Sequence, residues 1–367
     1  MKFLVQRADL LQMIARIQGA VPTRPAIPIL ANVLMEAASD QVILSATDLT
    51  VSIRAYCDAK VQQEGAITLP ARRLFQLVRE LQAPQVEIEA ISPEVALVHA
   101  GSSHFKIQGM HKSEFPALPD LSQGHELSLQ AGQFKEMLMR TAFAAARDDT
   151  RPALNGVLMQ KSGTLFTFVG TDGKKLAKNA FELPGSSAES GSYIIPLGAV
   201  EEMAKLLENG DEKIKLVVMR DKIALETGAV TIISKLLTGQ YPDFARVIPA
   251  KQPSTLKLHR EELIALLRQV ALFTSEQSSA VRFSFTEGLL HLSAISGEIG
   301  EGKVNMPVNY SGPKLDIAFN PHCFLDVLRH SKDEVVNFSV TEPFSPGLVT
   351  DSSQAQFVIM PMRLVEA

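Results

Sequence analysis

The part of the sequence that most resembles a catalytic or ligand-binding motif is a short run of glycines and lysines. Gly170-Thr-Asp-Gly-Lys-Lys175 has the look of a phosphate-binding loop. Such a loop requires GxxxxGK followed by Ser or Thr, and Lys175 stands in that position instead. An Asp-Gly pair that follows an apolar run is typical of a tight hairpin turn. The run therefore predicts a turn and not a phosphate site.

Other combinations of reactive residues also lack the spacing that chemistry requires. The eight histidines form no HxxxH or HExxH pair, and no Gly-x-Ser-x-Gly sequence occurs. Asp48 and Asp172 could act as catalytic carboxylates, but they occupy matching positions in repeated text, which favours a turn or capping role. The glycines of Gly297-Glu-Ile-Gly-Glu-Gly302 are in the wrong order for a dinucleotide loop, so an exposed loop is predicted there. The sequence thus predicts no catalytic site, no cofactor and no metal site.

The elements that carry these residues are repeated along the chain at intervals of about 124 to 126 residues. PILANVLMEA, from Pro28, returns as PALNGVLMQK from Pro152. LPARRLFQLVREL, from Leu69, returns as IPLGAVEEMAKLL from Ile195 and as FNPHCFLDVLRHS from Phe319. Repeated domains build arcs, solenoids or rings, whereas an enzyme usually needs one asymmetric site. The repeat therefore favours a scaffold.

Each copy contains two patterns of helical spacing separated by alternating, β-branched text. The helical positions are Leu10, Leu11, Ile14 and Ile17, then Leu74, Leu77, Val78 and Leu81; Phe134, Met137, Leu138 and Phe143, then Val200, Met203, Leu206 and Leu207; Leu263, Leu266, Leu267 and Val270, then Phe324, Leu325, Val327 and Leu328. Strand-like runs include 42–46, 165–169 and 335–340. We expect six helices and an α+β fold in which helices cover one face of antiparallel sheets.

Length and composition are those of an ordinary multidomain protein. The 367 residues are 46% apolar and 21% charged, and the repeat divides them into domains at 1–123, 124–253 and 254–367. The joints between the domains, at 118–124 and 249–254, contain Pro, Gly and Ser. They are too short to let the domains move independently, so a fixed arc of domains is expected.

The net charge and the cysteines bear on the cellular location of the protein and on its ability to bind nucleic acid. A net charge of −4 gives no global attraction to nucleic acid, so DNA binding would require basic residues gathered on one face. Basic residues do recur on the helical segments, but a charged helix surface is also ordinary. No secretion signal or apolar run of 18 residues occurs, and Cys57 and Cys323 lie in different repeats without metal-type spacing. These features predict a cytoplasmic protein with reduced thiols and no membrane span.

Several longer motifs resemble those of one family. They are RPAIPILANVL from Arg24, LPARRLF from Leu69, LNGVL from Leu154, TDGKKLA from Thr171, SKLLTGQYPDFARVIP from Ser234 and MPMRL from Met360, together with MKF at the start, TDL at Thr47 and FPAL at Phe115. From Met1 to Leu364 the chain resembles the bacterial DNA polymerase III beta subunits, the β sliding clamps.

The resemblance implies a fold, a function and a set of partners. It implies three tandem clamp domains, with helices on the inner face and antiparallel sheets outside, in a head-to-tail homodimeric ring. Such a ring encircles double-stranded DNA without regard to sequence, performs no catalysis and confers processivity on the replicative polymerase. The implied partners are the DNA polymerase III alpha subunit, the clamp loader, and other polymerases and repair proteins with clamp-binding motifs.

The resemblance also implies three groups of site residues. The expected DNA contacts are Arg24, Arg72, Arg73, Arg140 and Arg147. The expected peptide groove comprises Leu154, Thr171, Gly173, Leu176, Pro242, Arg246, Val247, Asn320, Phe344, Val358, Met360, Pro361, Met362 and Arg363. The expected dimer interface contains Phe105, Ile107, Leu272, Phe273, Glu298 and Glu301, with His104 and Lys106 as charged neighbours.

The chain departs from the family pattern at several positions, and two other functions stay open. Lys174-Lys175, Pro152-Ala153 and Cys323 replace the residues that family members often carry, and Val365–Ala367 extends past the usual end. One alternative is a hydrolase or nuclease that uses Asp48 or Asp172. The other is a repeat scaffold that binds peptides without encircling DNA.

Overall fold

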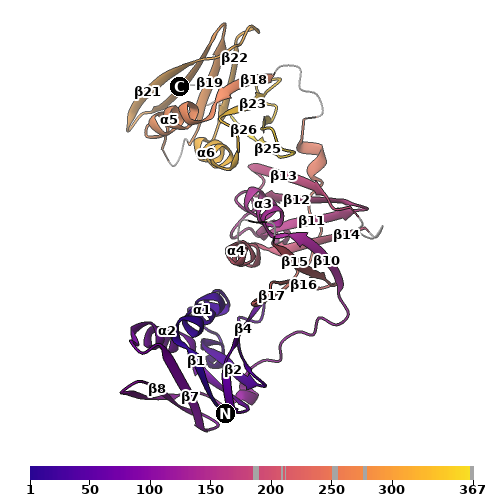
Figure 1. Cartoon of the computed structure of the whole chain (residues 1–367). Helices are drawn as coiled ribbons and strands as arrows, with labels where there is room; N and C mark the ends of the chain where they lie inside the picture. The colour runs from indigo at the N-terminus through magenta and orange to yellow at the C-terminus, as the bar shows by residue number, and fades with distance from the viewer. Residues whose placement is uncertain (185–189, 208–209, 211, 250–254, 276–278, 364–367) are drawn as a thin grey trace. The chain divides into compact units, whose positions relative to one another are not determined.

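The computed structural model describes residues 1–184, 190–207, 210, 212–249, 255–275 and 279–363 (Figure 1). It contains two compact units. Unit 1 comprises Met1–Gln133 and Glu202–Leu236, and unit 2 comprises Phe134–Glu201 and Leu237–Ala367. Both units therefore contain part of the central repeat.

Six α-helices lie in the described residues, and each coincides with one predicted helical pattern. They are α1 (Arg7–Ile17), α2 (Ala71–Glu80), α3 (Ala131–Ala142), α4 (Leu197–Leu206), α5 (Arg260–Ala271) and α6 (Pro321–His330). In α2 the spacing buries Leu74 and Val78 and leaves Arg72 and Arg73 exposed. The α6 helix begins where the Asn320 side chain accepts hydrogen bonds from backbone N–H groups, with Pro321 in the first turn.

The strands of unit 1 form two sheets in which every pair is antiparallel. The five-stranded sheet has the order β5-β1-β7-β8-β9, and the eight-stranded sheet has the order β10-β15-β16-β17-β4-β3-β2-β6. The bounds are β1 (Lys2–Gln6), β2 (Asn32–Ala38), β3 (Gln41–Thr47), β4 (Val51–Asp58), β5 (Lys60–Gln63), β6 (Gly65–Pro70), β7 (Gln85–Ser92), β8 (Val95–Ala100), β9 (Ser103–Gln108), β10 (His125–Gln130), β15 (Lys213–Val218), β16 (Lys222–Glu226) and β17 (Val230–Lys235).

Unit 2 repeats this plan. Its eight-stranded sheet has the order β14-β11-β12-β13-β25-β24-β23-β18, and its five-stranded sheet has the order β21-β20-β19-β22-β26. The bounds are β11 (Gly156–Ser162), β12 (Leu165–Thr171), β13 (Lys175–Glu182), β14 (Gly191–Pro196), β18 (Thr255–His259), β19 (Val281–Thr286), β20 (Leu289–Ser296), β21 (Gly300–Pro307), β22 (Leu315–Phe319), β23 (Val335–Ser339), β24 (Gly347–Thr350), β25 (Gln356–Ile359) and β26 (Pro361–Met362).

The two units join their strands in the same way. In unit 1, β17 pairs with β4, and in unit 2, β25 pairs with β13. In each unit, helices pack together and against a sheet: α1 contacts α2 and β4, and α5 contacts α6 and β20 (Figure 1). These contacts confirm the predicted α+β fold with helices covering antiparallel sheets.

Two tight turns contain the aspartates that could have been catalytic. Asp172 Oδ1 accepts hydrogen bonds from the backbone N–H groups of Lys174 and Lys175, at 2.8 and 2.9 Å. Gly173 in this turn has φ 84°, a left-handed conformation that glycine adopts without strain. Asp48 makes the equivalent bonds in the first repeat, at 2.8 and 2.7 Å. The predicted turn and capping role is confirmed for both residues.

A few local details differ from the sequence expectations. Phe143 lies beyond the end of α3 and stacks on His330, with ring centroids 4.0 Å apart. The segment 297–302 is a hairpin turn whose last residues already belong to β21. The joint at 250–254 and the extension at 365–367 fall outside the described residues.

Both cysteines are free thiols, as predicted. Cys323 is buried, whereas Cys57 is half-buried. Burial, together with the negative charges of Asp9 and Asp58, raises the pKa of the Cys57 thiol to about 11, so its reactive thiolate form is scarce at neutral pH. None of the helices in the described part of the chain is long and apolar enough to cross a membrane.

Candidate functional site

A small apolar groove lies in unit 2, where the central and C-terminal repeats share a sheet. Its volume is about 130 Å³, comparable with the roughly 150 Å³ of an engineered cavity that accepts benzene. The groove therefore holds one large apolar side chain at a time. The lining residues are Arg151, Leu154, Thr171, Gly173, Lys175, Leu176, Pro242, Asp243, Phe244, Val247, Val358 and Met360.

Strand pairing positions the floor and one wall of the groove. Leu176 on β13 lies opposite Val358 on β25, and the Met360 N–H donates to the carbonyl of Lys174 at 2.9 Å. Leu154 and Val358 are buried at 1% exposure, whereas Met360 retains 36%. The floor therefore belongs to the buried core, whereas the partly exposed side chain of Met360 can contact a ligand. The unbranched thioether of Met360 adapts to different shapes, so this wall can fit apolar groups of more than one shape.

The opposite wall comes from the 3₁₀ helix η5 (Phe244–Val247). The Tyr241 hydroxyl anchors this segment by donating to the carbonyl of Val169 at 3.1 Å. Burial raises the pKa of the Tyr241 phenol, so it stays a protonated donor at neutral pH. Val247, at the end of η5, remains 37% exposed and faces the groove.

The polar residues at the rim form ion pairs within the protein. Lys175 Nζ lies 3.0 Å from Asp172 and 3.5 Å from Asp326. Burial opposes the charge of Lys175, but these carboxylates outweigh it and raise the pKa of the ammonium. Arg151 hydrogen-bonds Asp149 and holds the pKa of that carboxyl at about 2. The rim therefore presents cations that are already partly neutralised.

The structure gathers most of the groove residues named in the sequence analysis, but not all of them. Eight line the groove: Leu154, Thr171, Gly173, Leu176, Pro242, Val247, Val358 and Met360. Six are not among the lining residues: Arg246, Asn320, Phe344, Pro361, Met362 and Arg363. Arg246 instead pairs with Asp243 at 2.8 Å, and Phe344 is 79% exposed.

Four lining residues are absent from the sequence expectation: Arg151, Lys175, Asp243 and Phe244. Lys175, Asp243 and Phe244 lie inside the motifs TDGKKLA and SKLLTGQYPDFARVIP, and Arg151 precedes the repeated Pro152. Position in or beside a motif does not reveal which side of a turn faces a groove. That direction is decided by the tertiary contacts of each turn.

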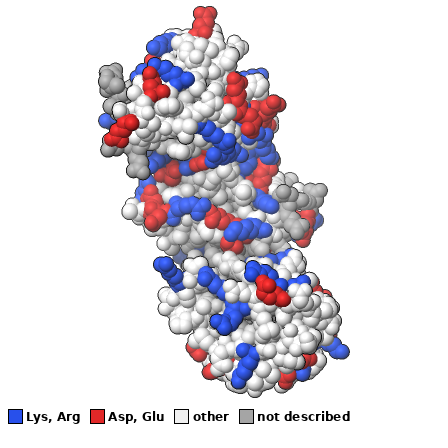
Figure 2. Space-filling view, turned by 90° about the vertical axis from the view of Figure 1, so that its left-hand side faces the viewer, with Lys and Arg blue, Asp and Glu red and all other residues white. Residues whose placement is uncertain are grey.

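Basic side chains gather on the helix-bearing face of unit 1. Arg24, Arg72 and Arg73 are exposed, and no ion pair involves any of them among the described residues. The lowest part of the view in Figure 2, on the side where α1 and α2 lie in Figure 1, carries several blue side chains. In unit 2, Arg147 is 78% exposed and pairs with Glu201 at 2.8 Å.

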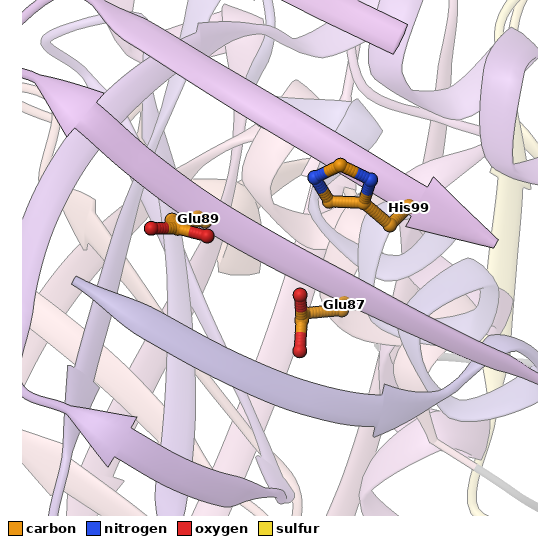
Figure 3. Close-up of side chains that lie close together, drawn as sticks. All are labelled: Glu87, Glu89 and His99. Carbon is orange, nitrogen blue, oxygen red and sulfur yellow. The ribbon is translucent and has the colours of Figure 1, made fainter. Parts of the chain in front are cut away.

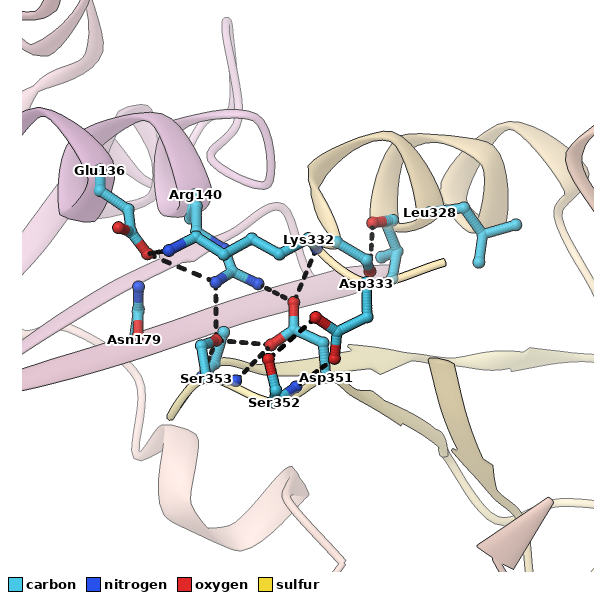
Figure 4. A network of polar contacts seen from close by, with 12 residues as sticks. Glu136, Arg140, Asn179, Leu328, Lys332, Asp333, Asp351, Ser352 and Ser353 are labelled. Carbon is cyan, nitrogen blue, oxygen red and sulfur yellow. Dashed lines mark hydrogen bonds and ion pairs between the residues drawn. The ribbon is translucent and has the colours of Figure 1, made fainter. Parts of the chain in front are cut away.

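Arg140 does not belong to such a face, which corrects the sequence expectation for this residue. It is 5% exposed, and its guanidinium is paired with Asp351 and bonded to Ser353 Oγ at 2.6 Å (Figure 4). It also lies over the Phe357 ring, 5.3 Å from the centroid. A side chain enclosed in this way is not available to a phosphate, so Arg140 connects α3 to the β24–β25 turn instead.

The expected interface residues of unit 1 lie on an unpaired sheet edge. The edge strand β9 carries Phe105, which is 38% exposed, and Ile107, which is buried at 4%. Beside it is a hollow of about 780 Å³. Its lining residues are Arg73, Gln76, Leu77, Glu80, Leu81, Gln82, Ala83, Ala100, Gly101, Ser102, Ser103 and Phe105.

The expected interface residues of unit 2 lie at another edge. Leu272, just after α5, is 73% exposed. Phe273 is half-buried because its ring packs closely against Gly302 of the edge strand β21. Glu298 is exposed, and Glu301 pairs with Lys303 at 2.5 Å. In each unit, one edge strand of the five-stranded sheet thus has an exposed apolar side chain beside it.

Comparisons with known proteins cover the whole chain. Residues 1–119, 128–243 and 245–363 match the N-terminal, central and C-terminal domains of the DNA polymerase III beta subunit. The chain is 48% identical over 364 residues to the beta sliding clamp of Chlamydia pneumoniae, covering 99% of both chains. It is 32% identical over 369 residues to the Escherichia coli beta sliding clamp, covering 99% of this chain and 100% of the other.

The fold agrees with a solved structure of the same kind. The DNA polymerase III subunit beta from Pseudomonas aeruginosa superposes with a TM-score of 0.95 at 30% identity, covering 99% of this chain and 100% of that one. Because three successive domains and a full-length relative agree, the chain belongs to the DNA polymerase III beta subunit family, the beta sliding clamps.

Proposed function

We propose that the protein is a DNA sliding clamp, a non-catalytic homodimeric ring that encircles duplex DNA and confers processivity on the replicative polymerase. The observation that carries this proposal is the agreement of all three domains with beta sliding clamps over 99% of the chain. We assign its three domains to residues 1–123, 124–253 and 254–367. Asp48 and Asp172 support a non-enzymatic role because both hold turns together. We infer a cytoplasmic location, where replication takes place.

Ring closure pairs the edge strand β9 of one protomer with the edge strand β21 of its partner. Such pairing satisfies the free backbone groups that every edge strand presents. Leu272, which is 73% exposed, enters the hollow beside Phe105 of the other protomer. Lys106 then faces the acidic pair Glu298 and Glu301 across the interface.

DNA is held by topology more than by affinity. The net charge of −4 opposes general attraction to a polyanion. Exposed arginines on the helix face supply a few local phosphate contacts, for which Arg24, Arg72, Arg73 and Arg147 are the candidates. Few contacts make weak, sequence-independent binding, which lets a closed ring slide.

The groove of unit 2 docks the proteins that work on the encircled DNA. These partners are the DNA polymerase III alpha subunit, the clamp loader, and other polymerases and repair proteins with clamp-binding motifs. An apolar side chain of the partner fills the space between Val247 and Met360, above the floor formed by Leu154 and Val358.

Retention on DNA circles tests the encirclement. Protein loaded on nicked circular DNA should stay bound in moderate salt and dissociate once the DNA is cut to a linear form, because a ring slides off an open end. Gel filtration of the complexes measures this. Equal retention on circular and linear DNA would instead favour a repeat scaffold that binds peptides without encircling DNA.

Calorimetry with a clamp-binding peptide of a polymerase III alpha subunit tests the groove. Replacing Val247 and Met360 together with Ala should weaken binding by at least about tenfold, which corresponds to about 1.4 kcal/mol. Met362→Ala is the matched control, since Met362 lies in the same chain segment outside the groove lining. Unchanged affinity in the double variant, with the fold intact, would show that the groove is placed wrongly.

A further inference from the structure

A row of potential metal ligands crosses the five-stranded sheet of unit 1. Glu87 on β7 is paired with His99 on β8, and His99 is paired with His104 on β9. Residues directly opposite each other on antiparallel strands have Cβ atoms about 4.5–5.5 Å apart on one face. The other face of these strands is core, with Ile88 and Val98 fully buried. The register therefore places one carboxylate and two imidazoles together on the outer face.

The donor atoms on β7 and β8 converge, and His104 on β9 joins them through its contact with His99. One ligand atom each of Glu87, Glu89 and His99 lie within 4.8 Å of one another, and Figure 3 shows these three side chains on the same side of their strands. Nδ1 of His99 lies 2.5 Å from Nδ1 of His104. At this distance a proton must stand between the two nitrogens, because two lone pairs would repel each other. One imidazole therefore donates its Nδ1–H to the Nδ1 of the other.

The neighbouring charges also favour a cation. Lys2 Nζ lies 3.2 Å from Glu87 and 3.0 Å from Glu89. A single ammonium therefore serves two carboxylates. Lys2 donates to the carboxylates and neutralises only one of their two negative charges. If Lys2 stays with Glu89, the Glu87 carboxylate is free to coordinate an ion.

We propose that Glu87, His99 and His104 form a binding site for Zn²⁺ on the outer face of this sheet. Zn²⁺ takes histidine nitrogens and carboxylate oxygens at about 2.0–2.2 Å in a tetrahedral arrangement, which sets two ligand nitrogens about 3.3 Å apart. The two imidazoles must therefore separate by roughly 0.8 Å, a shift that rotation of partly exposed side chains supplies. Water completes the fourth position. Both Nδ1 atoms must present a lone pair to the ion, so the imidazole that donates in the absence of Zn²⁺ binds as its Nε2–H tautomer.

Calorimetric titration of the full-length protein with ZnCl₂ tests the site. We expect one ion per chain. His99→Asn and His104→Asn should each lower the affinity at least about tenfold. His291→Asn is the matched control, since that histidine bonds Asn305 on another sheet and should leave binding unchanged. Lys2→Met should strengthen binding, because it removes the competing ammonium.

Two further measurements keep the test decisive. An unchanged Zn²⁺ affinity in the His99→Asn/His104→Asn double variant would overturn the proposal. Titration with Co²⁺ should give visible d–d bands without a thiolate charge-transfer band, whereas such a band would assign the ion to Cys57 or Cys323. Circular dichroism checks whether the Asn variants disturb the sheet. If they do, Glu87→Gln deletes one ligand and retains the shape of the side chain. Unchanged Zn²⁺ binding in that variant would likewise overturn the site.

Discussion

The role of a single residue in this protein depends on partners that are far away in the sequence. Arg140 sits on an ordinary charged helix, yet its guanidinium pairs with Asp351, which is 211 residues away in the chain. Asp351 has no exposed side-chain surface and also accepts a hydrogen bond from the Lys332 N–H at 2.9 Å. The pair therefore connects the central repeat to the C-terminal repeat within unit 2.

Removing one partner of this buried pair should be strongly destabilising. Asp351→Ala leaves the Arg140 charge buried without its counter-ion, which costs about 3–5 kcal/mol in the free energy of unfolding. Urea denaturation measures this value. The control is Asp221→Ala, because Asp221 pairs with Lys222 at the surface and its loss should change stability far less. A similarly small effect at Asp351 would contradict the structural role.

The same carboxyl predicts a dependence of stability on pH. Burial disfavours the charge on Asp351, but hydrogen bonds from Ser353 and Lys332 and the charge of Arg140 outweigh it and lower the pKa of this carboxyl below its usual value of 3.8. A lowered pKa in the folded state stabilises the protein above the unfolded pKa, and this stability is lost as the pH falls through the folded pKa. The stability difference between wild type and Asp351→Asn should therefore be constant near neutral pH and shrink below about pH 4. Urea denaturation across this pH range checks it, and a difference that grows on acidification would contradict the assignment.

At the scale of elements, the free sheet edges are the features that call for a partner. Each five-stranded sheet has two edge strands, and those with an exposed apolar side chain beside them are β9 in unit 1 and β21 in unit 2. Exposed strand edges promote uncontrolled association unless they are covered. The proposed ring covers both edges at once.

Truncating the apolar residues after α5 should open the proposed ring. Leu272→Ala with Phe273→Ala removes the anchor that enters the partner's hollow, and dimerisation should weaken by roughly 2–4 kcal/mol. Sedimentation at micromolar concentration should then detect monomer. Because Phe273 also packs on Gly302 of its own chain, the single variant Leu272→Ala separates association from folding. Ile91→Ala, a 52% exposed residue of β7, is the control and should remain dimeric.

At the scale of the whole molecule, charge distribution matters more than net charge. The protein carries 40 acidic and 36 basic side chains, so any attraction to DNA must come from local gatherings of arginine. The exposed arginines of α2 form such a gathering, whereas Arg140 is withdrawn into the core.

Replacing two of these arginines should change the salt dependence of DNA binding. Each lost phosphate contact lowers the slope of log K against log salt by about 0.9. Arg72→Ala with Arg73→Ala should therefore reduce the slope by about 2, measured by fluorescence anisotropy on short duplex DNA. Lys60→Ala with Lys112→Ala removes the same charge from exposed positions outside the α-helices. An equal effect in both double variants would mean that DNA does not contact the helix face specifically.

Local spacing in the sequence determined the secondary structure and the repeat. Every predicted helical pattern corresponds to one of the helices α1 to α6, because burial of one helix face requires apolar residues at a period of 3.6. The turns at Asp48 and Asp172 could likewise be predicted from the sequence, because an aspartate caps backbone N–H groups only a few residues away. The family motifs extended this reading to eight of the residues that line the groove.

Only the tertiary structure decided which distant side chains meet. Arg140 changed from a candidate DNA contact to a buried ion pair because Asp351 reaches it through the fold. The row of Glu87, His99 and His104 has no recognisable spacing in sequence, and the sequence predicted no metal site. It exists because strand register sets residues from three strands side by side. Local periodicity reports which face of an element is buried, but the free energy of long-range pairing selects its neighbours, and that information is spread over the whole chain.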